Sequence, residues 1–357
     1  MTQKYKESSE MVDFDKKMMQ RCIFLAQRGR GATSPNPMVG SVITHKNKII
    51  GEGFHRQHGG PHAEVNAINS VIDKSLIPES TLYVNLEPCS HWGKTPPCTD
   101  LIIENKIKRV VIGSIDTCSL VAGKGVTKLR DAGIEVVINV EIEKCRELNI
   151  RFFTFHEKKR PYIILKWAET SDGFVDKIRN PKENLPQWIT NDEARLLVHR
   201  WRTEEDAILV GKNTALFDNP SLNVRLTSGK NPTRVVVDFN GDLPLNLNVF
   251  DGTQPTIVFT TNPTRFAIKD LRAFKIEEDF NVQTILDILY LNKTQSIIIE
   301  GGTFTLQQFI DQGYWDEALR FVGNKTFQTG ISAPNFKYEH HNVEQIGDCV
   351  LFTYFES

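Results

Sequence analysis

Short apolar, strand-like segments alternate with helix-like segments along almost the whole chain, and this alternation restricts the fold more than any other feature. Strands separated by helices pack as a layered α/β sheet, because the helices cover the apolar faces of the sheet. The strand-like segments of the first half are MVGSVITH, KIIGEGFH, TLYVNL, RVVIGS and IEVVINV. The helix-like segments are the stretch from Asp13, PHAEVNAINSVI, DLIIENK and KGVTKLRDAG. The first half is therefore predicted to form a three-layer α/β/α domain.

A charged segment, HEKKRP at residues 156–161, interrupts the alternation and is the expected linker between two domains. The expected divisions are a disordered lead-in over residues 1–12, a first domain over 13–153, a linker over 154–160 and a second domain over 161–357. Beyond the linker the predicted strands are YIILKWA, DAILVG, TRVVVDF, TIVFTT, SIIIE, EALRFVG and CVLFTYF. TNDEARLLVHRW is a predicted helix capped by Thr190 or Asn191, as Asp13 is expected to cap the first helix. The second domain is therefore also predicted to be α/β.

The charge balance of the chain argues against a nucleic-acid or membrane partner. Its 43 Lys and Arg residues against 44 Asp and Glu residues give a formal net charge of −1, which creates no overall basic field. No apolar run is long enough for a transmembrane helix, and the first residues, MTQKYKESSEMVDFDKK, lack the apolar core of a signal peptide. We therefore expect a cytoplasmic protein that binds neither nucleic acid nor membrane.

The stretch LEPCSHWGKTPPC, residues 86–98, contains two cysteines, Cys89 and Cys98, whose chemistry needs to be decided. A disulfide, a pair of metal ligands and two unrelated buried thiols are the alternatives. Six cysteines in a chain without a signal peptide are more typical of thiols or metal ligands than of a disulfide framework. A single cysteine is most often a buried thiol. The neighbouring residues are therefore needed to distinguish two buried thiols from a pair of metal ligands.

Upstream of these cysteines, PHAEV supplies His62 and Glu64. Zinc deaminases hold Zn²⁺ with one His and two Cys, which leaves the fourth position open for water. The metal lowers the pKa of that water toward about 7, and the Glu two residues after the His moves its proton to the ring nitrogen and to the leaving ammonia. His62, Cys89 and Cys98 are therefore candidate zinc ligands, and Glu64 is the candidate acid and base.

Other interpretations of this motif stay open at this point. The usual deaminase signature has two residues between its cysteines, whereas eight separate Cys89 from Cys98. The long insert makes a deaminase of free nucleosides or of transfer RNA less expected. A closed structural zinc site with His91 or another residue as the fourth ligand is a further alternative, in which Glu64 would be a solvated helix carboxylate.

In the second half, SIIIEGGTFTLQQFI is a strand, a Gly-Gly turn and a helix, a form that lets backbone N–H groups approach a phosphate. A Gly-Gly turn is by itself equally typical of a tight loop. LVGKNTALFDNPSLNVR, residues 209–225, is predicted to be a strand followed by a polar loop, at the end of a sheet where α/β proteins bind ligands. Arg202 and Arg225 are candidates for a substrate phosphate, because a guanidinium pairs with phosphate through two hydrogen bonds.

Taken together, the motifs resemble those of the RibD-type bifunctional deaminase–reductases of riboflavin biosynthesis. The first half shares PNPMVG, GEGFH, HAEV and LEPCSHWGKTPPC with that family, and the second half shares LKWAETSDG, QWIT, DAILVGKNT, DNPSLNVR and IIIEGG. The resemblance extends from about residue 14 to the end of the chain, and the eight-residue cysteine spacing is its most specific part. It implies a cytidine-deaminase-like domain followed by a reductase domain similar to dihydrofolate reductase, and a homo-oligomer.

The resemblance implies two successive reactions on a small phosphoribosyl pyrimidine. The first removes the 2-amino group of 2,5-diamino-6-(5-phosphoribosylamino)pyrimidin-4(3H)-one, and the second reduces the ribosyl group to ribityl with NADPH. It implies that one zinc ion per chain is held by His62, Cys89 and Cys98. It also implies that Asn36, His55 and Lys94 contact the first substrate.

For the reductase half the resemblance implies two groups of residues. Those expected at the NADP site are Ala168, Trp188, Thr214, Asp218, Gly302, Thr303, Phe304, Thr305, Leu306, Gln307 and Gln308. Those expected at the sugar-phosphate substrate are Lys166, Pro186, Arg202, Leu222, Arg225 and Glu300. We add our own hypothesis that Thr261, Asn262 and Arg265, which follow the strand TIVFTT, contact the 2′-phosphate of NADPH.

At a few positions the chain departs from the family. Ser171 replaces a usual Leu, Pro186 replaces a usual Ser that contacts substrate, and Asp116-Thr117-Cys118-Ser119 replaces the usual Asp-Pro-Asn-Pro. These departures leave room for a zinc deaminase of a nucleoside or transfer RNA with a degenerate reductase domain, for which cytidine deamination would be diagnostic. A non-catalytic zinc-stabilised binding module is the remaining alternative, and it predicts that loss of the Glu64 carboxylate has no effect.

Overall fold

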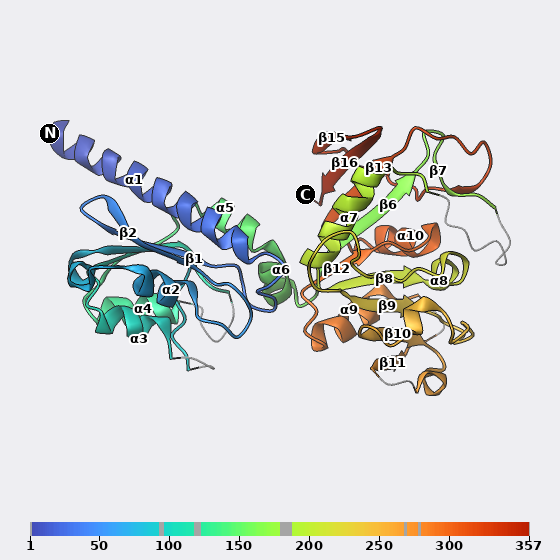
Figure 1. The fold of residues 1–357 in the computed structure, drawn as a ribbon, viewed down its shortest axis with the longest axis horizontal. Coiled ribbons are helices and arrows are strands. Elements are labelled where there is room, and N and C mark those ends of the chain that lie inside the picture. The colour runs from blue at the N-terminus through green and yellow to red at the C-terminus, as the bar shows by residue number, and fades with distance from the viewer. Residues whose placement is uncertain are drawn as a thin grey trace. The chain divides into compact units, whose positions relative to one another are not determined.

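The computed structural model describes residues 2–92, 96–117, 123–178, 188–267, 270–277 and 280–356 (Figure 1). The chain divides into two compact units, Met1–Lys158 and Lys159–Ser357. The division lies within the segment 154–160 that was expected to be the linker. Lys94, Cys118 and Pro186 lie outside the described residues.

The first unit is built on a mixed sheet. Within its described residues, five strands pair in the order β2-β1-β3-β4-β5, with β1 antiparallel to both neighbours and β3, β4 and β5 parallel. The strands are β1 (Gly40–His45), β2 (Lys48–Phe54), β3 (Thr81–Leu86), β4 (Arg109–Ser114) and β5 (Glu135–Val137). Lys46 and Asn47, with φ values of 47° and 58°, form the predicted two-residue turn between β1 and β2.

Helices cover both faces of this sheet, as the three-layer prediction requires (Figure 1). The helices are α1 (Thr2–Ala26), α2 (Ala63–Ser70), α3 (Cys98–Glu104), α4 (Lys124–Asp131), α5 (Ile142–Leu148) and α6 (Ile150–Lys158). Ile68, Ile102 and Leu129 of α2, α3 and α4 pack on one face against Leu82 and Val84. On the other face, α1 and α5 pack around Tyr83. Successive residues of β3 therefore serve opposite layers, as the pleat of a strand dictates.

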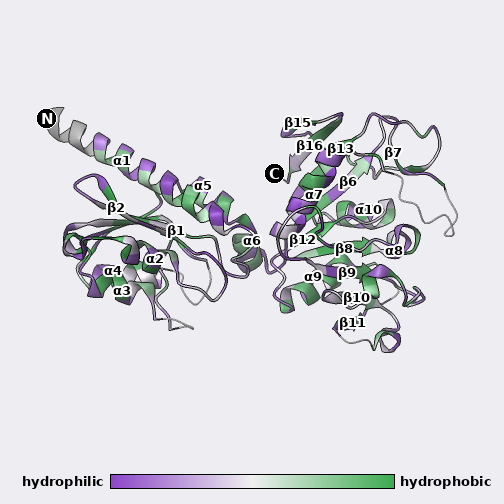
Figure 2. Ribbon diagram, in the orientation of Figure 1, coloured by the Kyte–Doolittle hydropathy of each residue, from purple (hydrophilic) through white to green (hydrophobic). Residues whose placement is uncertain are grey.

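Two helices extend further than the sequence suggested. Helix α1 begins at Thr2, where a disordered lead-in over residues 1–12 was expected, so Asp13 lies inside the helix and does not cap it. No Gly or Pro occurs between Thr2 and Ala26, so nothing in the backbone stops the helix. Figure 2 shows hydrophobic and hydrophilic turns alternating along α1. Helix α6 likewise continues to Lys158, into the expected linker, because the first Pro comes only at Pro161.

The second unit contains a larger, mostly parallel sheet. Within the described part of this unit, nine strands pair in the order β11-β10-β9-β8-β12-β6-β13-β16-β15, and only the β13–β16 and β16–β15 pairs are antiparallel. They are β6 (Tyr162–Glu169), β8 (Ala207–Gly211), β9 (Thr233–Val237), β10 (Thr256–Thr260), β11 (Leu271–Lys275), β12 (Ser296–Ile299), β13 (Glu317–Val322), β15 (Asn342–Ile346) and β16 (Cys349–Phe355). The carboxyl ends of the parallel strands therefore share one edge of the sheet.

Four helices accompany this sheet in the described residues: α7 (Asp192–Glu204), α8 (Lys212–Asp218), α9 (Val282–Leu291) and α10 (Thr303–Asp311). Asn191 caps α7, accepting the Ala194 N–H at 2.8 Å, which confirms one of the two predicted caps. Leu286 of α9 and Phe309 of α10 pack into the core of the sheet. A short ribbon of β7 (Phe174–Asp176) and β14 (Ile331–Ser332) lies apart from the main sheet.

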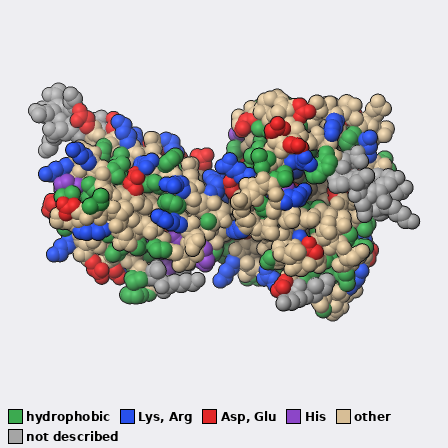
Figure 3. Space-filling view, viewed as in Figure 1, with side chains coloured by type: hydrophobic (Ala, Val, Ile, Leu, Met, Phe, Trp, Pro, Cys, Tyr) green, Lys and Arg blue, Asp and Glu red, His purple; other side chains and the backbone are tan. Residues whose placement is uncertain are grey.

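The surface agrees with the charge balance of the sequence. On the face drawn in Figure 3, Lys and Arg side chains are interspersed with Asp and Glu side chains. Among the helices that the structure describes, none is both long enough and apolar enough to cross a membrane.

Candidate active sites

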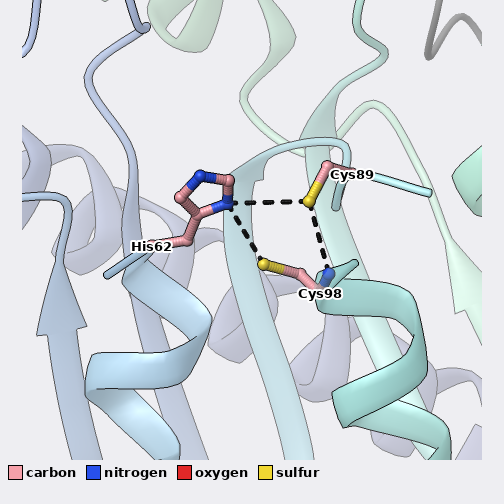
Figure 4. A group of neighbouring side chains, drawn as sticks. All are labelled: His62, Cys89 and Cys98. Carbon is pink, nitrogen blue, oxygen red and sulfur yellow. Dashed lines mark hydrogen bonds between the residues drawn. The ribbon is translucent and has the colours of Figure 1, made fainter. Parts of the chain in front are cut away.

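The three predicted metal ligands meet at the starts of two helices of the first unit (Figure 4). His62 directly precedes α2, Cys98 is the first residue of α3, and Cys89 lies in the loop after β3. His62 Nδ1 lies 3.3 Å from Cys98 Sγ and 3.6 Å from Cys89 Sγ, and the three ligand atoms all lie within 4.8 Å of one another. Tetrahedral zinc, with bonds of about 2.0 Å to nitrogen and about 2.3 Å to sulfur, separates such atoms by roughly 3.5 Å. The donor set therefore fits zinc in both chemistry and spacing.

Glu64 lies in the first turn of α2 and is almost completely buried, with 3% of its surface exposed. It is not one of the three clustered donors. Burial raises the pKa of the Glu64 carboxyl above its ordinary value, and the nearby Cys89 thiolate adds to this rise. A raised pKa lets this carboxyl hold a proton more readily than an ordinary Glu does, which favours a role in general acid–base chemistry.

The sulfur atoms and the imidazole influence one another. A hydrogen bond with Cys98 is the largest cause that lowers the pKa of the Cys89 thiol, and the same interaction raises the pKa of Cys98. The backbone N–H of Cys98 also donates to Cys89 Sγ at 3.3 Å. One of the two thiols is therefore readily ionised even before a cation is present, as metal binding requires.

His55 and Asn36, expected substrate contacts, lie beside this cluster. The ring of His55 packs edge-on to that of His62, with centroids 5.4 Å apart. His55 Nδ1 lies 3.0 Å from the carbonyl oxygen of Pro61, and Nε2 lies 3.1 Å from Asn36 Nδ2. Since the carbonyl can only accept, Nδ1 carries the hydrogen and Nε2 accepts from the Asn36 amide. Burial lowers the pKa of His55, which agrees with this neutral form.

Glu87, to which the sequence analysis assigned no role, anchors the loop that carries Cys89. Its buried carboxylate accepts four backbone N–H groups, those of Asp116, Gly123, Gly125 and Val126, at 3.2, 3.0, 2.8 and 3.2 Å. These donors belong to the loop after β4 and to the start of α4. At Gly125 an added Cβ would lie only 2.3 Å from the oxygen of Pro88, so this close approach requires glycine. The signal in the sequence was a charged residue at the end of an apolar strand.

A cavity of about 940 Å³ opens at the carboxyl edge of the second sheet. Its position fits the rule that parallel α/β sheets bind ligands beyond the ends of their strands. The predicted residues that line it are Lys166, Ala168, Trp188, Arg202, Thr214, Asp218, Leu222, Arg225, Glu300, Gly302, Thr303, Phe304, Thr305 and Leu306. Gly302, of the Gly-Gly turn between β12 and α10, thus lies at the cavity. Residues 212–218, expected to be a polar loop, form helix α8, which places Thr214 and Asp218 on a helix.

Some predicted residues do not line this cavity. Gln307 accepts the Asn335 N–H at 2.8 Å, and the Gln308 side chain lies 3.3 Å from that of Gln312. Thr261, Asn262 and Arg265 are also absent from the lining, and Arg265 instead donates to the carbonyl of Gly241. The side chains of Gln307, Gln308 and Arg265 form hydrogen bonds with neighbouring helices and loops, and other residues line the cavity.

The departure at Ser171 has a structural consequence. The N–H and the hydroxyl of Ser171 both donate to the Lys325 carbonyl, at 2.9 and 3.1 Å. The ammonium of Lys325 in turn donates to the carbonyl of Trp188 at 2.6 Å. Through Lys325, the Ser171 side chain therefore connects the β6–β7 turn to Trp188, which was predicted to contact the cofactor.

A charged cluster forms one wall of the cavity. Arg202 donates to Glu300 at 2.8 Å and to the carbonyl of Asn223 at 3.3 Å. Burial opposes ionisation of Glu300, but Arg202 and Lys166 outweigh it and hold the pKa of this carboxyl at about 2. Burial lowers the pKa of Lys166. Arg202 Nε and Glu300 Oε1 are buried and have no hydrogen-bond partner among the described residues, so both remain available to a ligand.

Two further residues of this wall were not named by the sequence analysis. Arg195 and His199 lie on α7 and line the cavity beside Arg202. The guanidinium of Arg195 lies 4.6 Å from the ring of Trp188. The spacing of 195, 199 and 202 puts all three on one helix face, a signal that the sequence contains, although a solvated face shows the same pattern.

Comparison with known proteins identifies similar sequences over both units. A family model described as "Cytidine and deoxycytidylate deaminase zinc-binding region" matches residues 12–114, and one described as "RibD C-terminal domain" matches residues 161–340. The riboflavin biosynthesis protein RibD of Aquifex aeolicus is 40% identical over 356 residues, covering 95% of this chain and 98% of its own. That of Bacillus amyloliquefaciens is 42% identical over 358 residues, covering 94% of each chain.

Solved structures are similar over the same extent. One is a diaminohydroxyphosphoribosylaminopyrimidine deaminase/5-amino-6-(5-phosphoribosylamino)uracil reductase from Thermotoga maritima. It is 39% identical, with a TM-score of 0.86, over 96% of this chain and 99% of its own. Another is the RibD of Acinetobacter baumannii, 31% identical with a TM-score of 0.88, over 96% of this chain and 99% of its own. The similarity in each case includes both units and their order.

Proposed function

Because the chain belongs to the RibD family and is a bifunctional deaminase and reductase of riboflavin biosynthesis, we propose that it catalyses two successive steps on one phosphoribosyl pyrimidine. The first is hydrolytic deamination of 2,5-diamino-6-(5-phosphoribosylamino)pyrimidin-4(3H)-one. The second is NADPH-dependent reduction of the ribosyl group, which yields 5-amino-6-(5-phosphoribitylamino)uracil. The observation that carries the proposal is the pairing of a His/Cys/Cys cluster beside a buried Glu with a separate, cationic cavity. The alternative of a nucleoside or transfer-RNA deaminase with a degenerate reductase domain is not adopted.

In the deaminase unit, His62, Cys89 and Cys98 would hold zinc and leave one position open to water. Zinc bound there supplies the Lewis acidity that makes water nucleophilic near neutral pH. Glu64 would accept a proton from the attacking water and pass it to a ring nitrogen. It would then take the second proton from the hydroxyl of the resulting adduct and deliver it to the amino group, so that C2=O forms as the C2–N bond breaks and ammonia leaves. The raised pKa of Glu64 supports this role. His55 and Asn36 would orient the pyrimidine through their mutual hydrogen bond and neighbouring polar atoms.

In the reductase unit, Arg202 and Arg225 would bind the sugar phosphate, since guanidinium groups pair well with phosphate. NADPH, when bound, would supply the hydride for C1′ of the sugar in its open or imine form, and a proton would complete the gain of two hydrogens. Ala168, Trp188 and the Gly302–Leu306 segment would hold that cofactor against the carboxyl edge of the sheet. Lys166 and Glu300 would orient the sugar, and the negative charge of Glu300 is balanced by Arg202 and Lys166. The contribution of the protein is mainly positioning.

The experiment that tests the proposal is mass spectrometry of the diaminopyrimidine ribosyl phosphate after incubation with zinc-loaded enzyme. Without NADPH the product should exchange one amino group for oxygen, and with NADPH it should also gain two hydrogens. If only the first change appears, the reductase assignment is wrong. If neither appears, the deaminase assignment is wrong for this chain.

A further inference from the structure

The helix face that carries Arg202 into the cavity also carries a histidine that has no assigned role. His199 lies on α7 one turn before Arg202, it lines the cavity, and only 4% of its surface is exposed. A buried polar ring is costly unless its nitrogen atoms have partners. The question is therefore what each nitrogen of His199 contacts.

One nitrogen has a partner within the protein. The backbone N–H of Arg225 donates to His199 Nδ1 at 3.3 Å. An acceptor nitrogen carries no hydrogen, so the neutral ring must carry its hydrogen on Nε2. No hydrogen bond joins Nε2 to any of the residues that the structure describes. The donor side of the ring is thus left for a molecule in the cavity.

The surrounding charges keep this ring neutral. Arg195 and Arg202 face it from α7, Arg225 faces it from the loop after α8, and Glu300 faces it from the end of β12. Burial is the largest cause, and the arginines add to it, so the pKa of His199 is lowered to about 4. Only Glu300 acts in the opposite direction, and it is already paired with Arg202. The ring therefore stays neutral at physiological pH, with one nitrogen that accepts and one that donates.

The hydrogen bond from the Arg225 N–H to His199 matters because the loop that carries Arg225 has an unusual backbone conformation. Leu222, three residues earlier, has a φ of 50°, a left-handed conformation that a branched side chain rarely adopts. Within the described part of the chain, the Arg225 side chain makes one hydrogen bond, of 3.3 Å, to the Asn223 side chain. A backbone hydrogen bond to His199 gives this segment a fixed point next to the cationic wall.

We propose that His199 is a substrate-binding and positioning residue of the reductase site. Its Nε2–H donates to a phosphate oxygen of the sugar-phosphate substrate, and its Nδ1 holds the Arg225 segment in place. The ring adds a hydrogen bond to the phosphorylated ligand without adding a further positive charge to a wall that already has several. The inference rests on the proposed reductase function and deepens it.

Two substitutions separate the two nitrogens. In H199N the short amide can replace Nδ1 as acceptor for the Arg225 N–H but cannot reach the position of Nε2. In H199Q the longer amide can place its N–H₂ group where Nε2 was but cannot accept from Arg225 in the same way. R200Q is the matched control, because Arg200 is exposed on the same helix and faces away from the cavity.

The measurements are KM and kcat for 5-amino-6-(5-phosphoribosylamino)uracil, the Kd for NADPH, and deaminase activity as an internal check on the first unit. For H199N we expect KM to rise about 10-fold to 100-fold, the range for a lost hydrogen bond to a charged group, with NADPH affinity and deaminase activity unchanged. For H199Q we expect a smaller rise in KM. R200Q should match the wild type.

An unchanged KM in H199N overturns the inference. Loss of NADPH binding in both variants also overturns it, because it would indicate a purely structural role. A wild-type enzyme that deaminates but does not reduce would instead refute the proposed reductase function, so the two failures can be told apart.

Discussion

The two candidate sites differ in how much of the chain is needed to build them. The candidate metal ligands come from residues 62–98, and their donor atoms lie within 4.8 Å of one another. The reductase cavity occupies about 940 Å³ and takes its lining from residues as distant as Lys166 and Ile331. A metal requires a few donors at fixed short distances, whereas two large organic ligands require space between several strand ends. A compact metal site therefore concentrates its residues in one short stretch of sequence, whereas a wide pocket distributes them over many.

The same residue type behaves in opposite ways at the two sites. Glu64 and Glu300 are both removed from solvent, but the pKa of Glu64 is raised and that of Glu300 is lowered to about 2. Burial dominates at Glu64, which has an anionic thiolate as its neighbour. At Glu300, Arg202 and Lys166 outweigh burial. The surroundings of Glu64 thus favour the protonated form of its carboxyl, and those of Glu300 favour the anion.

The largest expected effect tests what this comparison says of Glu64. E64Q should reduce the rate of deamination by about 10²-fold to 10⁴-fold, because an amide cannot accept the proton of the attacking water. Zinc content should stay unchanged, since Glu64 is not among the clustered donors. Reduction of the already deaminated substrate should also be unchanged. Retained deamination in E64Q would show that Glu64 is not the group that carries the proton in this reaction.

The second-largest expected effect tests what the comparison says of Glu300. R202M should lower the free energy of unfolding of the second unit by about 3–5 kcal/mol, because it leaves Glu300 buried and unpaired. The double variant R202M/E300Q should regain much of this loss. Denaturant unfolding of the full chain measures both. R200M is the control, since its pair with Glu204 is exposed on the arginine side and should matter by less than about 1 kcal/mol. Equal losses in R202M and the double variant would contradict the pairing.

A smaller effect is expected for Glu87, whose carboxylate anchors the loop that carries Cys89. In E87Q the side-chain NH₂ group would face backbone donors, so we expect a loss of about 1–3 kcal/mol from the network of four hydrogen bonds. The loop should then release zinc to a chelator faster than in the wild type. E79Q changes an exposed carboxylate that pairs with Lys108 and should leave zinc release unaltered. If E87Q releases zinc at the wild-type rate, Glu87 does not position Cys89.

The smallest expected effect is a pH dependence confined to the second unit. The pKa of Glu300 is lower in the folded chain than in the unfolded chain, where it is about 4.3. Its contribution to stability is therefore complete above that value and is lost as the pH falls toward about 2. Unfolding of wild type and E300Q between pH 7 and pH 3 should show a steeper acid loss in the wild type. Parallel pH profiles would contradict the lowered pKa.

Local features of the fold were accessible from the sequence because they depend on neighbours in the chain. Lys46 and Asn47 adopt the positive φ values that a two-residue hairpin needs, and Asn191 caps α7. The helical extent of residues 2–12 was missed because polar composition was given more weight than the absence of helix breakers. The helical form of residues 212–218 was missed because Asn, Thr and Asp favour loops when no tertiary contacts are considered.

By itself, the sequence determined the two α/β units, their order, and the metal-ligand set, since His62, Glu64, Cys89 and Cys98 lie close together along the chain in a spacing that few kinds of site share. Only the tertiary structure added Arg195 and His199 to the predicted residues that line the reductase cavity. His199 and Glu87 acquire their roles from partners that are distant in the chain, such as Arg225 and Gly125. The physical reason is that a parallel sheet aligns strand ends from widely separated segments, and it is this alignment that brings their side chains within hydrogen-bonding distance.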